Sequence, residues 1–204
     1  MNPRAVLVAL ALPAAVAASA VLSTAYAQTR SAEAAPAARY EIDAVHSTIV
    51  FRVKHLGVGY VYGRINDPSG TFTFDADNPE SATLEIAVKA GNVDTNHAAR
   101  DDHIRNVDFF NAKQFPEITF KSTGFTRSGD DTYKVTGNLT FRGVTKKISI
   151  DLERVGEGAD PWGKYRCGFH TTFSISRSAF GMDYMSEGLG DEIVLMVGFE
   201  GIRQ

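Results

Sequence analysis

The sequence contains a single cysteine, Cys167, among its 204 residues. One cysteine cannot form a disulfide within the chain, so the fold must be held together by the burial of apolar side chains. A chain of this length is long enough to build such a core within one domain. We interpret Cys167 as a small apolar side chain inside a strand, with a reactive thiol as the alternative.

The chain also lacks a concentration of positive charge. It has 21 Lys and Arg residues against 24 Asp and Glu residues, and its formal net charge is −3. Proteins that bind nucleic acids meet the phosphates with a clustered cationic face. The absence of a basic cluster therefore argues against a nucleic-acid partner.

Motifs for catalysis and metal binding are absent as well. The chain has neither a G-x-S-x-G turn nor an H-E-x-x-H helix. His46 and Ser47 are neighbours on a predicted strand, so their side chains point to opposite faces and do not pair. His97 and Asp101 share one face of a predicted helix, but His103 is six residues beyond His97 and points elsewhere. We predict a solvated helix face there, with no metal site and no catalytic residues.

The first 27 residues have the pattern of an export signal. Arg4 provides a positive start, residues 5–22 are almost wholly apolar, and Ala25-Tyr26-Ala27 places small residues at a signal-peptidase site. An uncleaved membrane anchor is the alternative, because the apolar run nearly reaches spanning length. Pro13 interrupts that run, so we predict a cleaved signal peptide and a periplasmic protein.

Strand-like alternation begins after a flexible lead-in at residues 28–39, which is rich in Ala, Ser and Pro. No second linker follows, so we predict one domain over residues 40–204. Apolar and polar residues alternate with a period of two in several segments. These segments are 48–55, 83–89, 133–142, 148–153, 165–175 and 193–199.

The order of these elements predicts an all-β, antiparallel fold of about eight strands. Turn residues separate the strands, and crossover helices are missing between them. A two-sheet sandwich and a closed barrel are both consistent with this pattern. One short helical insertion is predicted at residues 96–105, capped by Asp94 or Thr95. The aromatic cluster at residues 109–115 is placed to cover one end of a barrel.

Arg177 stands out because of its position in the alternation. Counting by two from Tyr165 through Ile175 places Arg177 on the apolar face. A cation at the mouth of an apolar cavity is costly unless it is paired or meets an anionic headgroup. The alternative is that the alternation breaks at the end of the strand and Arg177 meets solvent or an acidic neighbour.

Seven stretches of the chain, in order and from about Tyr40 to the C-terminus, resemble the YceI-like family of polyisoprenoid-binding proteins. The first, HSTIVFRVKHLGVGYVYGRI, spans residues 46–65, and the others span 74–88, 93–123, 133–148, 160–163, 176–182 and 190–201. The resemblance implies a lipocalin-like antiparallel barrel with a helical insertion. It also implies export, an isoprenoid chain or other amphiphile in the cavity, a homodimer, and in some relatives a cytochrome b-type membrane partner.

We therefore expect a carrier or store of an isoprenoid quinone or prenyl lipid that needs no other cofactor. Arg177 and His46 are the candidate headgroup contacts. An enzyme or redox accessory acting on the headgroup, with His46, His97 or His103 as acid–base groups, is one alternative. A stress-related protein with a filled core is another. The candidate cavity-lining residues, for which ordinary core packing is the alternative, are Ile49, Phe51, Leu84, Ile86, Phe141, Phe169, Phe173 and Phe199.

Overall fold

The computed structural model describes residues 37–204. The strands are β1 (Ala38–Ile42), β2 (Thr48–His55), β3 (Gly59–Ile65), β4 (Ser69–Phe74), β5 (Thr83–Lys89), β6 (Val93–Asp94), β7 (Glu117–Arg127), β8 (Thr132–Phe141), β9 (Val144–Ala159), β10 (Tyr165–Ser176) and β11 (Leu189–Arg203). The helices are α1 (Ala98–Arg105) and the short 3-10 turns η1 (Pro79–Ser81), η2 (Ala90–Asn92) and η3 (Ser178–Phe180). The predicted signal peptide and most of the predicted lead-in lie outside the described residues.

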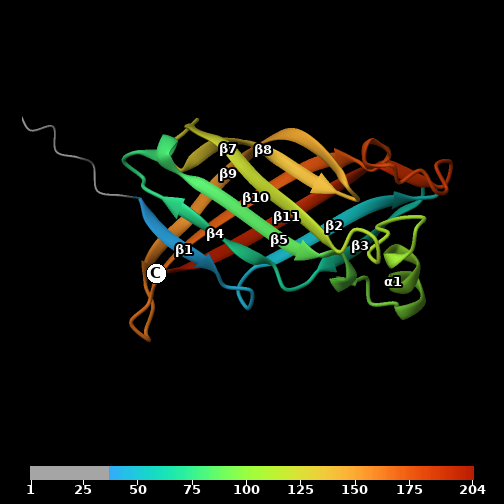
Figure 1. Cartoon of the computed structure of the whole chain (residues 1–204), viewed down its shortest axis with the longest axis horizontal. Helices are drawn as coiled ribbons and strands as arrows, with labels where there is room; N and C mark the ends of the chain where they lie inside the picture. Colours follow the sequence, from blue (N-terminus) through green and yellow to red (C-terminus); the bar gives the residue numbers. More distant parts are fainter. Residues whose placement is uncertain (1–36) are drawn as a thin grey trace, which may run out of the picture. The chain divides into compact units, whose positions relative to one another are not determined.

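Eight of the strands form a closed antiparallel barrel (Figure 1). Neighbours follow the order β1-β4-β5-β7-β8-β9-β10-β11, and β11 pairs back onto β1. Tyr40 lies opposite Arg203 and Ile42 opposite Gly201 at this closure. The prediction of an antiparallel barrel of about eight strands is confirmed, and the closure decides between the barrel and the sandwich.

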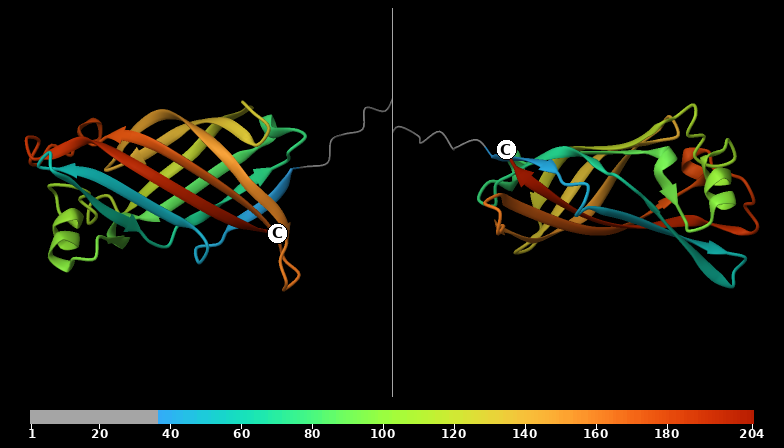
Figure 2. Two further views of the ribbon diagram at one scale, coloured as in Figure 1. Left: turned by 180° about the vertical axis from the view of Figure 1, so that it is seen from behind. Right: turned by 90° about the horizontal axis from the view of Figure 1, so that it is seen from below.

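The 15-residue strand β11 gives the barrel two different ends. Its C-terminal part pairs with β1, whereas Gly198 to Leu189 pair with β2. The β2–β3 hairpin therefore extends the wall beyond the closed ring, together with β6 (Figure 2). We call the end with β1, β4 and the β9–β10 turn the closed end. The end with the β2–β3 hairpin, α1 and the segment at residues 177–188 between β10 and β11 is the open end.

Aromatic side chains fill the closed end. The rings of Tyr40 and Phe72 stack with centroids 4.8 Å apart, and Phe169 and Phe199 lie 5.4 Å apart. Edge-to-face contacts join these pairs to one another and to two further rings. We call these six buried residues the aromatic plug: Tyr40, Phe72, Phe74, Tyr133, Phe169 and Phe199.

Cys167 is fully buried beside this plug, on the inward face of β10. The pKa of its thiol is raised to about 12, mainly by burial and to a smaller extent by the negative charge of Glu157. A thiolate is the nucleophilic form of cysteine, so this thiol is poorly reactive. The interpretation of Cys167 as a small apolar core residue is confirmed.

Helix α1 begins later than predicted, because its cap is a different residue. His97 is the N-cap, and its Nδ1 accepts a hydrogen bond from the Arg100 amide at 3.2 Å. Thr95 is engaged elsewhere: its amide and hydroxyl donate to Asp101 Oδ1 at 2.8 and 2.5 Å. Asp101 is thus buried and hydrogen-bonded, and the prediction that it lies on a solvated face is wrong.

Among residues 37–204, no helix combines the length and the apolar character needed to cross a membrane.

Candidate functional site

A cavity of about 480 Å³ lies at the open end of the barrel. Strands β2, β3, β8, β10 and β11 contribute to its wall, together with α1 and the loops after α1 and after β10. Two of its lining residues, Tyr184 and Met185, are also exposed, so the cavity reaches the surface. The lining residues are Phe51, Val53, His55, Val61, Ile65, Arg100, His103, Ile104, Phe109, Phe110, Phe141, Ile175, Arg177, Met182, Tyr184, Met185, Leu189, Ile193 and Leu195.

The strand part of the wall follows from the alternation of the sequence. Phe51 and Val53 of β2 point inward and lie opposite Leu195 and Ile193 of β11. On the other side, Phe51 lies opposite Gly63 of β3. A side chain at Gly63 would collide with the Phe51 ring, so glycine lets that ring pack against β3.

Aromatic residues after α1 form the cover of the cavity. Phe110 packs edge-on against Phe141 with centroids 4.9 Å apart. Phe109 packs against His103 at 5.1 Å and against Tyr184 at 5.4 Å. These contacts join the loop after α1 to the loop after β10 over the cavity. Part of the predicted aromatic cluster therefore does cover one end of the barrel.

Arg177 lies in the wall of this cavity and is only 4% exposed. Its guanidinium donates to four backbone carbonyls: Gly190 at 3.0 Å, Met182 at 2.5 Å, Tyr184 at 2.9 Å and Leu189 at 3.2 Å. Arginine has five N–H donors, so one N–H of Arg177 has no acceptor among the described residues. Arg177 thus ties the two halves of the 182–190 loop together and presents a cation to the cavity contents.

No carboxylate forms a salt bridge with Arg177 within residues 37–204. The nearby Asp191 instead accepts hydrogen bonds from the Ser176 hydroxyl at 2.5 Å and the Ser178 amide at 2.9 Å. Of the two possibilities that the sequence leaves open for Arg177, the structure favours a buried position in the cavity wall.

The other ionisable groups of the cavity wall are also bases, apart from Tyr184. They are His55, Arg100 and His103, and the wall contains no Asp or Glu. Arg100 donates to the Thr95 hydroxyl at 2.7 Å and to its carbonyl at 2.8 Å, and His103 Nε2 lies 2.8 Å from Asp108 Oδ2. A cavity of this kind accommodates an apolar chain together with a hydrogen-bond-accepting headgroup.

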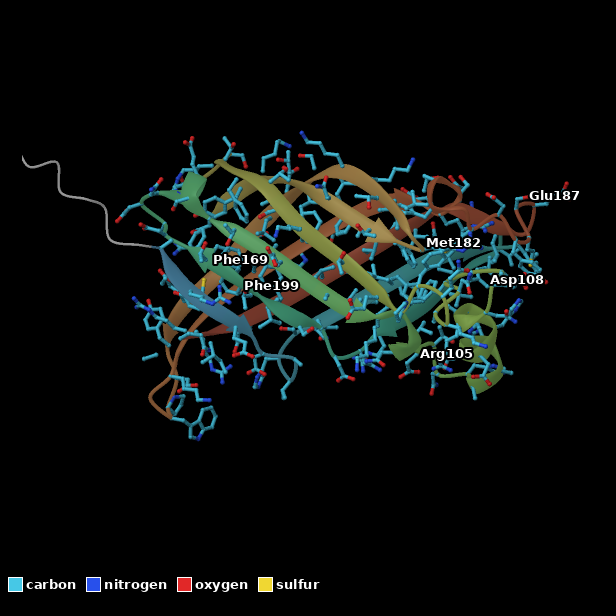
Figure 3. All side chains as sticks on the ribbon, in the orientation of Figure 1. Arg105, Asp108, Phe169, Met182, Glu187 and Phe199 are labelled. Atoms are coloured by element: carbon cyan, nitrogen blue, oxygen red, sulfur yellow. The ribbon has the colours of Figure 1, made fainter. Side chains whose placement is uncertain are left out.

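A second, smaller space of about 90 Å³ lies deeper in the barrel. It shares Ile65 and Leu195 with the wall of the large cavity, so the two spaces adjoin. Towards the closed end, the space among the plug residues shrinks to about 10 Å³, at or below the volume that a single water needs. Figure 3 shows Phe169 and Phe199 far from Met182 and Asp108, which mark the open end.

The predicted lining residues divide among these three regions. Phe51 and Phe141 line the large cavity. Phe169 and Phe199 are plug residues; Phe199 also lines the small space, and Leu84 lines both the small space and the space at the plug. The small space is lined by the remaining four predicted residues: Ile49, Leu84, Ile86 and Phe173.

His46 is not near Arg177, the other candidate headgroup contact. It lies in the β1–β2 connection, outside the walls of all three spaces, and its Nδ1 is 2.8 Å from Asp43 Oδ2. Arg166 donates to Asp43 at 2.8 Å, to Asp160 at 2.7 Å and to Glu200, and so offsets part of the negative charge of this cluster. Asp43, His46 and Glu200 have the side-chain types of a metal site, but the guanidinium already occupies their carboxylates.

Several lining residues were not predicted as such, because they lie on loops or on the helical insertion. Met182, Tyr184 and Met185 follow β10 in a segment without alternation, and Arg100 and His103 lie on the helical insertion. For Phe109 and Phe110, the sequence contained a usable signal in the aromatic cluster. For the other five, no periodic pattern points to the cavity.

Comparison with known proteins gives a consistent result. The model of the YceI-like domain family matches residues 40–200. A UPF0312 protein of Pectobacterium atrosepticum is 42% identical over 183 residues, which cover 89% of this chain and 95% of the relative.

Two solved structures share the fold. BcnA of Burkholderia cenocepacia is similar with a TM-score of 0.71 and 22% identity, over 78% of this chain and 98% of that chain. A domain of Saccharophagus degradans described as polyisoprenoid-binding, and implicated in plant cell wall breakdown, has a TM-score of 0.63 and 13% identity. That match covers 82% of this chain and 99% of that chain. At these identities, the two structures establish the architecture alone.

Proposed function

Since the chain belongs to the YceI-like family, we propose that it binds a long amphiphilic lipid of the polyisoprenoid type in the open-end cavity. The apolar cavity of about 480 Å³ is the observation that carries this proposal. Its volume lies within the range of known small-molecule sites, roughly 300–1,000 Å³. The solved domain described as polyisoprenoid-binding, which shares the fold, supports the choice of lipid.

The arrangement of the two spaces suits a chain with a polar head. An isoprenoid tail placed in the large cavity can continue past Ile65 and Leu195 into the smaller space. The headgroup then lies among the basic groups of the wall, where Arg177 has a free donor. A quinone carbonyl or another oxygen acceptor matches that donor.

The free energy of binding comes mainly from the apolar tail. Each Å² of apolar surface removed from water contributes about 25 cal/mol, so several hundred Å² contribute several kcal/mol. Ordering a flexible tail and losing its translational freedom offset part of this gain. A moderate affinity is therefore expected, which suits a carrier that must also release its lipid.

The role that we propose is that of a periplasmic carrier or store, and not of an enzyme. Binding in an apolar cavity needs no catalytic group. A homodimer and a cytochrome b-type partner remain predictions from the family resemblance.

The first experiment is to identify what the protein holds after export. We would express the full chain in bacteria, purify it without detergent, extract it with organic solvent and analyse the extract by mass spectrometry. Native mass spectrometry of the intact protein gives the stoichiometry. A stoichiometric prenyl lipid or quinone is expected. An empty protein that also fails to take up added prenyl lipids would overturn the proposal. That result would favour the alternative that this chain has a filled core and acts by binding another protein.

A further inference from the structure

Large apolar side chains on the surface gather around the open end. Ten such side chains are exposed among residues 37–204. Single exposed apolar residues are normal on soluble proteins, but a group of them marks a contact surface. Seven of the ten lie on the β2–β3 hairpin or on the loops after α1 and β10: Leu56, Val58, Tyr60, Tyr62, Val107, Tyr184 and Met185.

The tip of the β2–β3 hairpin projects from the open end (Figure 2), and two of its apolar residues are exposed. Val58 is 87% exposed and Leu56 is 55% exposed. Leu56 has a φ of +50°, a left-handed conformation that a bulky side chain rarely adopts. The turn thus holds a leucine in water at the position where a glycine, an asparagine or an aspartate is usual.

This tip is continuous with the mouth of the cavity. The Leu56 amide donates to the Gly188 carbonyl at 2.6 Å, which joins the hairpin to the loop after β10. A side chain at Gly188 would collide with Met185 and approach Leu56, so these two apolar side chains flank the same backbone. Met185 also lines the cavity. An apolar surface therefore runs from the hairpin tip into the cavity.

The outer face of the same hairpin is positively charged. Residues 48–65 contain Arg52, Lys54 and Arg64 but no Asp or Glu, although the whole chain carries a formal charge of −3. The register places Arg52 opposite Tyr62 and Lys54 opposite Tyr60, so cations and exposed tyrosines share this face. None of the three cations has a salt-bridge partner within the described part of the chain.

We propose that the β2–β3 hairpin docks the cavity mouth onto a bilayer that contains anionic phospholipids. Leu56 and Val58 enter the interface, the two tyrosines lie at headgroup level, and the cations meet lipid phosphates. Docking lets a lipid pass between bilayer and cavity without crossing water. This surface goes beyond lipid binding in the cavity, and the two can be tested separately.

A second copy of the chain is the competing occupant of this surface. Among the described residues, the outer edge of β3 is paired only at Arg64 and Ile65, with β6, so Gly59 to Gly63 offer a free edge there. In a symmetric dimer that pairs the β3 edges of two copies, the cationic faces of the two hairpins lie side by side. Like charges at such an interface repel. An anionic lipid surface removes that repulsion, and the charge therefore favours the bilayer.

The test is flotation of the purified protein with vesicles of phosphatidylcholine, with and without phosphatidylglycerol. We expect binding to the anionic vesicles and a loss of about tenfold for Val58→Asp, since a charged side chain cannot enter the interface. The matched control is Val45→Asp, because Val45 is 85% exposed but lies in the β1–β2 connection. Binding lost equally in both variants, or absent in the unmodified chain, overturns the proposal.

Charge is tested with a second pair of variants. Lys54→Glu is expected to weaken binding to anionic vesicles by fivefold or more, whereas Lys147→Glu on β9 leaves it unchanged. Added salt should weaken the binding of the unmodified chain. Sedimentation that shows a dimer broken by Val58→Asp, without vesicle binding, would assign the surface to a second copy and overturn the proposal.

The single tryptophan gives an internal reporter of orientation. Trp162 is 80% exposed in the β9–β10 turn at the closed end, so its emission should not shift when vesicles are added. Val58→Trp in a Trp162→Phe background should show a blue shift with anionic vesicles. A shift of Trp162 instead would place the closed end on the bilayer. The lipid that Val58→Asp retains after purification is measured as well. If the variant keeps its cavity lipid but no longer binds vesicles, the substitution has affected docking and not lipid binding.

Discussion

At the closed end of the barrel the space bordered by plug residues measures about 10 Å³, whereas at the open end a wall that also carries two arginines and two histidines surrounds about 480 Å³. Both ends alternate inward apolar and outward polar side chains. The closed end is a complete ring, because β1 joins β11 to β4 there. At the open end, β3 pairs with β6 for only two residues, and α1 with its following loop provides the cover.

In this protein the filled core lies where the ring of strands is complete, and the cavity lies where the ring is incomplete. A complete ring of eight strands is narrow enough for inward side chains to meet across the axis, and at the closed end large aromatic rings fill it. Where the ring is incomplete, inward side chains lack partners on one side, and loops cover them at a greater distance. The closed end is then expected to supply stability and the open end to supply binding.

The strongest way to test this division is to truncate one aromatic side chain at each end. Phe169→Ala removes a ring packed against Phe72, Phe74 and Phe199, and we expect a loss of about 3–5 kcal/mol in the free energy of unfolding. Phe109→Ala, at the cavity cover, should cost less than about 2 kcal/mol but weaken lipid retention. Urea unfolding and extraction of bound lipid measure the two effects. Equal losses of stability would contradict the division.

Arg177 is the exception at the open end, because it stabilises the structure there. Arg177→Met leaves four carbonyls without their donor, and we expect a loss of about 2–3 kcal/mol. Amide hydrogen exchange within residues 182–190 should rise together with this loss. Arg177→Lys is the conservative control and should restore part of the protection. Unchanged exchange in Arg177→Met would show that the loop is held by other contacts.

Filling the cavity separates binding from stability. Leu195 borders both the large and the small space, so Leu195→Trp should weaken lipid binding tenfold or more. A tenfold loss of affinity corresponds to about 1.4 kcal/mol of binding free energy. The free energy of unfolding should change by less than about 1 kcal/mol, since the added ring enters an existing space. Val194→Trp, one residue earlier on the outer face, is the matched control. A large destabilisation by Leu195→Trp alone would mean that the cavity is already filled.

The smallest expected effect is a pH dependence from the cluster around Arg166. Hydrogen bonds from Arg166, and then from His46, lower the pKa of Asp43 from 3.8 to about 2. Because the folded-state pKa is the lower one, this stabilisation is present above pH 3.8 and is lost as the pH falls towards 2. In Asp43→Asn, the free energy of unfolding should therefore fall by about 1 kcal/mol less than in the unmodified chain as the pH is lowered through this window.

Glu80→Gln is the matched charge control for that variant. It removes an exposed carboxylate in η1, away from the Arg166 cluster. An identical acid-unfolding curve for Asp43→Asn and the unmodified chain would show that the cluster contributes no stability.

The sequence predicted the fold better than the site. The inward positions of β2, β5 and β8 to β11 follow from alternation, which depends only on the geometry of an extended chain. The position of Arg177 also follows, because the alternation of β10 continues by one residue. The helix start was misplaced because Thr95 hydrogen-bonds Asp101 and leaves the cap to His97.

The lining of the cavity was only partly predictable. Phe169 and Phe141 alternate in the same way, yet Phe169 lies in the plug and Phe141 faces the cavity. Met182 and Tyr184 lie on a loop whose path depends on four hydrogen bonds to Arg177. His46 lies in the connection between β1 and β2, where the sequence does not alternate. No pattern there shows whether a side chain faces the cavity or the solvent.

By itself, the sequence determined the all-β character of residues 40–204, the inward face of most strands and the family, since these depend on local alternation and on order along the chain. Only the tertiary structure decided which inward residues meet in a plug and which surround a cavity. That outcome depends on where β11 changes partner from β1 to β2, a register between segments about 150 residues apart in the chain. Local patterns carry the direction of each side chain, but closure of the barrel determines what each side chain meets.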